Sequence, residues 1–142
     1  MMEEKERRDI ILEHYMHPKH HYRKEEYPKV NTSIASCIDN LDIYIKFNPE
    51  TKIIEDMCFD GEACAIATSS TSIMIHNLIG KSIEEAKQYL TNIEKMLDHQ
   101  EYDHELLKEA NVFEEIYKQG HRKDCAYLPY KGIKQILNSF KD

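Results

Sequence analysis

Two neighbouring stretches of the chain alternate apolar and polar residues with a period of two. Residues 41–47 and residues 52–59 both show this pattern. Such alternation places the apolar side chains on one face of a β-strand. The residues between them, 48–51, include Pro49 and are typical of a turn, so the two stretches are predicted to form an antiparallel hairpin. Residues 33–36 are weakly strand-like and are expected to add a third strand.

Apolar residues spaced three and four positions apart predict helices in most of the remaining chain. The expected helices lie over residues 4–16, over residues 65–79, after Ser82, after Asp103 and around Pro129. Ser82 and Glu85 have the spacing of a capping box, and Asp103 can cap the next helix. Pro129 is expected in the first turn of the last helix, since proline is tolerated there.

Together these elements predict an α+β fold, in which a small antiparallel three-stranded sheet packs against helices. No internal repeat, low-complexity tract or linker divides the 142 residues, so residues 1–142 are predicted to form a single domain. A chain of this length can bury a core without a metal ion or disulfides as its main support. Any bound metal is therefore expected to tune the fold rather than to create it.

The charge of the chain limits its partners. Asp and Glu number 26 against 19 Lys and Arg, which gives a formal net charge of −7. Neither nucleic acid nor an anionic membrane is a natural partner for such a chain. No apolar run approaches the roughly 20 residues that span a bilayer, and the charged start does not resemble a signal peptide. The protein is expected to be cytoplasmic, where cysteines are more often reduced, metal-bound or catalytic than paired in disulfides.

Three thiols and one carboxylate are the candidate chemical groups: Cys37, Asp39, Cys64 and Cys125. Three sulfurs and an oxygen can close a tetrahedral site around Zn²⁺, and the same thiols can carry transferable sulfur. In an extended backbone Cys37 and Asp39 leave the same face. Cys64 is expected at the start of a helix, which favours its thiolate, and Cys125 is expected just before another. The thiols are too far apart in sequence for this spacing alone to identify a metal site.

Cys58 is not expected to be a ligand. It shares a strand face with Asp56 and Asp60, opposite the apolar residues of the same strand. We therefore expect a thiol that faces solvent or lies at a sheet edge.

Several short motifs carry a resemblance to a known family. They are His14-Tyr15, Pro18-Lys19, Cys37-Ile38-Asp39, the strand at residues 53–59 and the run at residues 61–70. In this order they resemble the landmarks of the SufU/IscU/NifU N-terminal family of iron–sulfur cluster assembly proteins, over about residues 8–140. Within it the chain is most similar to SufU, because a stretch from Glu101 through Gly120 resembles the SufU insertion. Arg122, three residues before the last Cys, also matches SufU.

The resemblance implies a zinc-dependent sulfur acceptor with a SufU/IscU-like fold. Zn²⁺ would be held by Cys37, Asp39, Cys64 and Cys125, with Arg122 supporting the site or a partner. A pyridoxal-phosphate cysteine desulfurase would pass persulfide sulfur to this chain, acting here as a sulfurtransferase, with Cys37 as the expected catalytic acceptor. Other iron–sulfur assembly proteins would receive the sulfur.

Two alternatives remain at this point. The same ligands could assemble a [2Fe–2S] cluster on an IscU-like scaffold, or zinc could stabilise an interaction protein without transfer activity. The family pattern has glycine where this chain has Ile38 and Ala63. Since glycine often supplies a positive φ, these two replacements predict an altered or strained backbone around the ligands.

Overall fold

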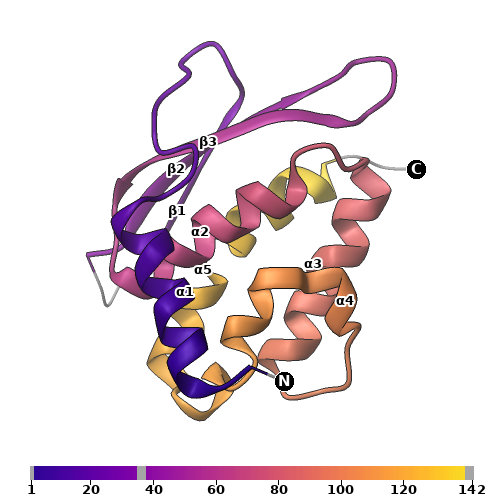
Figure 1. Ribbon diagram of the computed structural model, residues 1–142. Coiled ribbons are helices and arrows are strands. Elements are labelled where there is room, and N and C mark those ends of the chain that lie inside the picture. Colours follow the sequence, from indigo (N-terminus) through magenta and orange to yellow (C-terminus); the bar gives the residue numbers. More distant parts are fainter. Residues whose placement is uncertain (1, 35–37, 140–142) are drawn as a thin grey trace.

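A three-stranded antiparallel sheet forms one side of the molecule (Figure 1). The computed structural model of the protein describes residues 2–34 and 38–139. The strands are β1 (Lys29–Ser33), β2 (Asn40–Phe47) and β3 (Ile54–Glu62), in the order β1-β2-β3. The predicted hairpin of β2 and β3 is confirmed, whereas β1 begins and ends earlier than the predicted third strand.

The inner face of the sheet is apolar. Ile43 pairs with Phe59 and Ile45 with Met57, and all four side chains are buried. Helices α2 (Ala65–Leu78) and α5 (Gly120–Asn138) pack against this sheet. The alternation of apolar and polar residues thus directs one face of the hairpin to the helices, as expected for a half-buried sheet.

Helix α2 lies in the centre of the helical layer and is buried on almost every side. Residues 68–72 of this helix are all Ser or Thr, and such small side chains let neighbouring helices approach closely. The Ser70 hydroxyl donates to the carbonyl of Ala126 on α5, at 2.6 Å. The Thr71 hydroxyl donates to the carbonyl of Ala67 on its own helix, at 2.7 Å. These two buried hydroxyls thus find backbone acceptors, as burial requires.

Helix α1 (Glu4–Met16) covers α2, and one buried histidine joins it to two other elements. A ring nitrogen of His14 lies 2.8 Å from the Ser72 hydroxyl of α2. The other lies 3.0 Å from a carboxylate oxygen of Glu109 on the 3₁₀ helix η1 (Lys108–Phe113). The two ring nitrogens of this α1 residue thus tie α2 and η1 to α1.

The segment between the sheet-packed helices contains one long helix and several short turns. Helix α3 (Ile83–Leu97) begins with the predicted Ser82–Glu85 capping box. Asp103 caps the next helix as predicted, but this helix, α4 (His104–Leu107), is only one turn long. Lys108 has a positive φ of 49°, which ends it, and η1 and η2 (Ile116–Lys118) follow as separate 3₁₀ turns.

Helix α5 begins at Gly120, so two predictions about it are wrong. Pro129 lies inside the helix and not in its first turn, and Cys125 is in the second turn and not ahead of the helix. Proline removes a helical hydrogen bond and disturbs the turn before it. Two distant side chains bond to carbonyls of this turn: Ser70 to Ala126 at 2.6 Å and Thr32 of β1 to Leu128 at 2.9 Å. These tertiary bonds hold the turn before the proline against α2 and β1.

Candidate metal centre

Cys64 is the residue that starts α2. Strand β3 ends at Glu62, and Cys64 is the N-cap, with its Sγ accepting the Ala67 N–H at 3.4 Å. Gly61, the next-to-last residue of β3, has a φ of 127°, which glycine adopts without strain. A Cβ on Gly61 would lie 2.2 Å from the Asn40 carbonyl oxygen, so a larger residue cannot take this position without movement.

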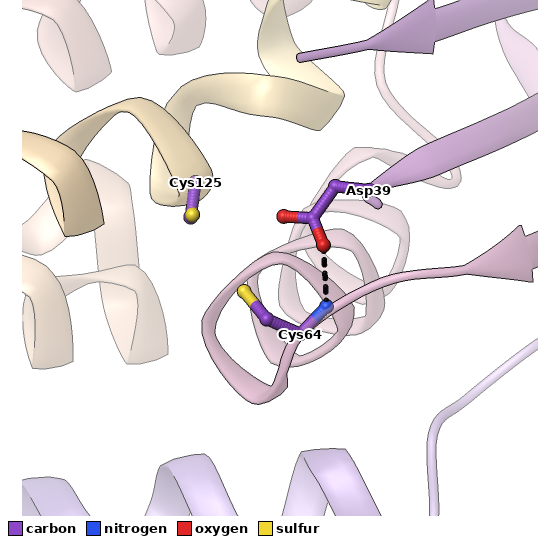
Figure 2. A group of neighbouring side chains, drawn as sticks. All are labelled: Asp39, Cys64 and Cys125. Atoms are coloured by element: carbon purple, nitrogen blue, oxygen red, sulfur yellow. Dashed lines mark hydrogen bonds between the residues drawn. The ribbon is translucent and has the colours of Figure 1, made fainter. Parts of the chain in front are cut away.

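Asp39 lies directly before β2 and is 1% exposed. Its Oδ1 accepts the backbone N–H of Cys64 at 2.7 Å (Figure 2). Its Oδ2 is buried and has no hydrogen-bond partner among the described residues. A buried carboxylate oxygen without a partner is costly in free energy, unless a cation is bound to it.

Cys125 comes to the same place from a third element. Its side chain extends from the second turn of α5 and is 2% exposed. It points toward the side chains of Asp39 and Cys64 (Figure 2). One ligand atom from each of Asp39, Cys64 and Cys125 lies within 4.8 Å of the others. The fold therefore gathers two sulfurs and one oxygen from segments far apart in the sequence.

The electrostatics of this cluster favour a positive ion. Burial, followed by the neighbouring thiol of Cys64 and the carboxyl of Asp39, raises the pKa of the Cys125 thiol well above its usual range. Three groups that would each be anionic as ligands lie together with little solvent, and a cation compensates their charge. Thiolates with a carboxylate are a donor set that suits Zn²⁺ and also iron. The residues present thus fit a metal.

The remaining predicted site residues have different outcomes. Cys37 lies outside the described residues. Ile38, next to Asp39, is 77% exposed. Ala63 does not have a positive φ, in contrast to Gly61 and to a few residues elsewhere in the described chain, so the backbone strain predicted for it is absent. Arg122 lies one turn before Cys125, exposed, and lines the same groove as the two cysteines.

The prediction that Cys58 faces solvent or a sheet edge is wrong, because its side chain is fully buried. The loop between α1 and β1 covers the outer face of the sheet at Cys58. In this loop the Tyr27 hydroxyl donates to Asp56 at 2.8 Å, and Arg23 forms an ion pair with Asp60. These two carboxylates flank Cys58 on its strand face. Burial, then the Asp56 charge, raises the pKa of the Cys58 thiol to about 11.

An open groove of about 720 Å³ leads to Cys64 and Cys125. One wall is α1 and the other runs from η1 to the start of α5. Arg8 and Leu12 line it, and the sequence did not single them out. Their four-residue spacing places them on one helix face, but only the fold shows that this face turns toward the cysteines.

No helix in the described part of the chain is both long and apolar enough to cross a membrane.

Comparisons with known proteins cover nearly the whole chain. The family model of the NifU-like N-terminal domain matches residues 6–142. The iron–sulfur cluster assembly scaffold protein IscU of Streptococcus pyogenes serotype M1 is 30% identical over 129 residues, which is 90% of this chain and 80% of the relative. The zinc-dependent sulfurtransferase SufU of Bacillus subtilis is 28% identical over 129 residues, 90% of this chain and 86% of its own.

A solved structure has the same fold. It is the crystal structure of a SufU from Fervidobacterium islandicum, a candidate iron–sulfur cluster assembly scaffold protein for the SUF system. Its TM-score is 0.85 at 31% identity, and the match covers 91% of this chain and 94% of that one. The sheet, the helices and their order are therefore shared.

Proposed function

The chain belongs to the family of NifU-like N-terminal domains, and from this premise we propose that it serves iron–sulfur cluster assembly as a zinc-dependent sulfur acceptor. The donor is a pyridoxal-phosphate cysteine desulfurase. The name of the B. subtilis relative, a zinc-dependent sulfurtransferase, supports this assignment. The pyridoxal cofactor belongs to the desulfurase.

The observation that carries the proposal is the buried Oδ2 of Asp39, which has no partner among the described residues and lies beside the thiols of Cys64 and Cys125. These three side chains would hold the zinc ion, together with Cys37, two residues before Asp39. Bound zinc would keep the thiols deprotonated and restrain their reactivity. The backbone N–H of Cys64 donates to the other oxygen of Asp39, and this hydrogen bond would orient the carboxylate toward a bound ion.

Sulfur transfer is an exchange reaction at sulfur. A thiolate of this chain, which we assign to Cys37, attacks the terminal sulfur of the persulfide on the desulfurase. A new S–S bond forms on the acceptor as the S–S bond of the donor breaks, and the donor cysteine leaves as a thiolate. The terminal sulfur keeps its proton, and no external oxidant or reductant is needed.

Metal analysis and turnover test this proposal together. Protein purified without added metal should contain one equivalent of zinc, and it should accelerate the cysteine desulfurase of the same organism. Mass spectrometry after turnover should find a gain of about 32 Da, one sulfur atom, on Cys37. If no thiol gains sulfur from that desulfurase, the transfer proposal fails, and a zinc-stabilised interaction protein becomes the better account.

Single substitutions separate ligands from bystanders. Cys37→Ala, Cys64→Ala and Cys125→Ala should each abolish the acceleration, because each removes the acceptor or opens the ligand set. Cys58→Ala is the matched control, since its side chain is buried under a loop and is not in the cluster. It should accelerate the desulfurase as the parent protein does.

A second candidate function is a scaffold that assembles a [2Fe–2S] cluster. The donor set of Asp39, Cys64 and Cys125 also suits iron, and the S. pyogenes relative is named as such a scaffold. Protein of this kind would contain iron and sulfide in place of zinc after anaerobic purification, and it would absorb visible light.

A further inference from the structure

The groove that ends at the two cysteines carries an excess of positive charge. Apart from the candidate metal ligands, the ionised side chains that line it are four cations and two anions: Arg7, Arg8, Lys118, Arg122, Glu4 and Glu115. This excess contrasts with the formal net charge of −7 for the whole chain. A concave surface lined mostly by one sign of charge concentrates its field and attracts the opposite sign.

Two of these cations are free to bind a further carboxylate. Arg122 has no ion pair within the described ranges, and it is exposed. Arg8 reaches only Glu4, at 3.6 Å, with both side chains more than half exposed. Exposed pairs of this kind contribute little, so a better placed carboxylate can replace Glu4. By contrast, Arg7 and Lys118 both hold Glu115, at 2.9 and 2.6 Å.

The walls between these charges are apolar. Ile11 and Leu12 of α1 face Ile116 of η2 across the groove. Leu12 is 45% exposed, so it has apolar surface left to bury. Apolar walls with a few fixed charges are typical of sites that bind an extended ligand in a defined direction.

The depth of the thiols restricts what can reach them. Cys125 is 2% exposed at the inner end of a groove of about 720 Å³, and Cys64 beside it is half-buried. A flat protein surface cannot contact Cys125 at such a depth. A segment that projects from the partner and enters the groove can.

We propose that this groove selects the sulfur donor by binding a projecting segment with apolar residues and at least one carboxylate, the carboxylate pairing with Arg8 and Arg122. This inference rests on the proposed function, since it takes the desulfurase as the partner. Leu12 and its apolar neighbours would bury the apolar residues of the segment.

Charge reversal at Arg8 tests the proposed ion pair between the groove and the carboxylate of the segment. Arg8→Glu in the zinc-loaded, full-length protein should weaken its affinity for the desulfurase of the same organism at least about tenfold and reduce the salt dependence of binding. Lys131→Glu is the matched control, because Lys131 is exposed on α5 and does not line the groove. It should change the affinity less than about twofold. The zinc content of both variants should equal that of the parent.

Photo-crosslinking tests the location and the chemistry of the segment. A benzoylphenylalanine in place of Leu12 should crosslink to one desulfurase peptide, which contains Asp or Glu beside apolar residues. The same group in place of Met16 is the control, because Met16 lies one turn further along α1, 66% exposed and outside the groove. It should give little or no crosslink.

The outcomes of these experiments distinguish a failure of this inference from a failure of the proposed sulfur-acceptor function. If the two proteins bind and sulfur is transferred, but Arg8→Glu behaves as Lys131→Glu does, the inference is wrong and the function stands. A crosslinked segment that is basic, or crosslinks only from position 16, also overturns the inference. If the parent protein neither binds the desulfurase nor accepts its sulfur, the function itself fails, and this assignment of the groove fails with it.

Discussion

The two oxygens of Asp39 are in different situations. One accepts a short hydrogen bond from the Cys64 N–H, and the other is buried without a partner among the described residues. Because a buried, half-satisfied carboxylate destabilises a fold, its retention beside two thiols is best explained by an ion.

Asp39→Asn should reduce zinc affinity at least about tenfold, in a competition with a chelator. The amide can still accept the Cys64 N–H, but its second atom is a donor and cannot ligate a cation, so the fold should be retained. Asp124→Asn is the control, since Asp124 is exposed beside Cys125. If Asp124→Asn loses zinc while Asp39→Asn binds it normally, the oxygen ligand is Asp124 and not Asp39.

The Cys58 thiol gives a prediction about alkaline pH. Burial and Asp56 raise the pKa of this thiol to about 11, so the folded protein holds the proton more tightly than the unfolded chain. Its contribution to stability is complete below about pH 9 and is lost as the pH rises toward 11. Denaturant unfolding should therefore show a steeper loss of stability over this range for the parent than for Cys58→Ala. Equal slopes would mean that this thiol is not protected in solution.

At the scale of elements, the end of the β2–β3 hairpin sets the geometry of the site. Asp39 precedes β2, and Cys64 follows β3, in which the next-to-last residue, Gly61, pairs with Leu41. The two ligands therefore move together with the last residue pairs of the hairpin.

Gly61→Ala should destabilise the protein by about 2–3 kcal/mol and weaken zinc binding, because both the φ of 127° and the contact with the Asn40 carbonyl oppose a Cβ. Gly80→Ala is a matched control: Gly80 also has a positive φ, of 94°, but no atom lies within 4 Å of an added Cβ. Gly80→Ala should lower the free energy of unfolding by about 1 kcal/mol and leave the zinc affinity unchanged. Chemical denaturation and chelator competition measure both effects.

Elements with local signals were predictable from the sequence. The helix at residues 4–16, the hairpin and the capping box at Ser82 depend on neighbours a few residues away, and all are confirmed. The position of Cys64 at a helix start is also confirmed, because the strand, the glycine and the helix follow one another directly.

Features that depend on distant partners were not predictable in this way. Pro129 lies inside α5, where hydroxyls of Thr32 and Ser70, far away in the sequence, bond to carbonyls of the turn before it. Cys58 is buried because a loop that precedes the sheet folds over its polar face. The groove needs α1, η2 and α5 together, and no single segment indicates it.

At the scale of the whole molecule, the fold has a large apolar core, to which the candidate metal centre contributes only Cys125, with Cys64 packed against it. Buried apolar residues from the sheet and from every long helix except α1 form one cluster, with α1 packed against it. The hydrogen bonds of His14 join α1, α2 and η1 on the far side of α2 from the sheet. Removing a metal therefore leaves most of the buried apolar area in place.

Treatment with a strong chelator should leave the far-ultraviolet circular dichroism nearly unchanged, while the melting temperature falls by several degrees, because only the binding free energy is lost. Readdition of zinc should restore the melting temperature. A chain that unfolds on chelation, as zinc fingers do, would contradict the view that the core supports the fold.

The hydrogen bond from the Cys64 N–H to Asp39 also makes this amide an internal probe. Its acceptor is one oxygen of a carboxylate whose other oxygen would bind the ion, so loading the site changes the electron density at the acceptor. In a nuclear magnetic resonance spectrum of ¹⁵N-labelled protein, the Cys64 amide should shift markedly on metal binding, whereas the amide of Gly80, at the far end of α2, should not. One resonance of the backbone thus reports the occupancy of the site without any added label at the ligands.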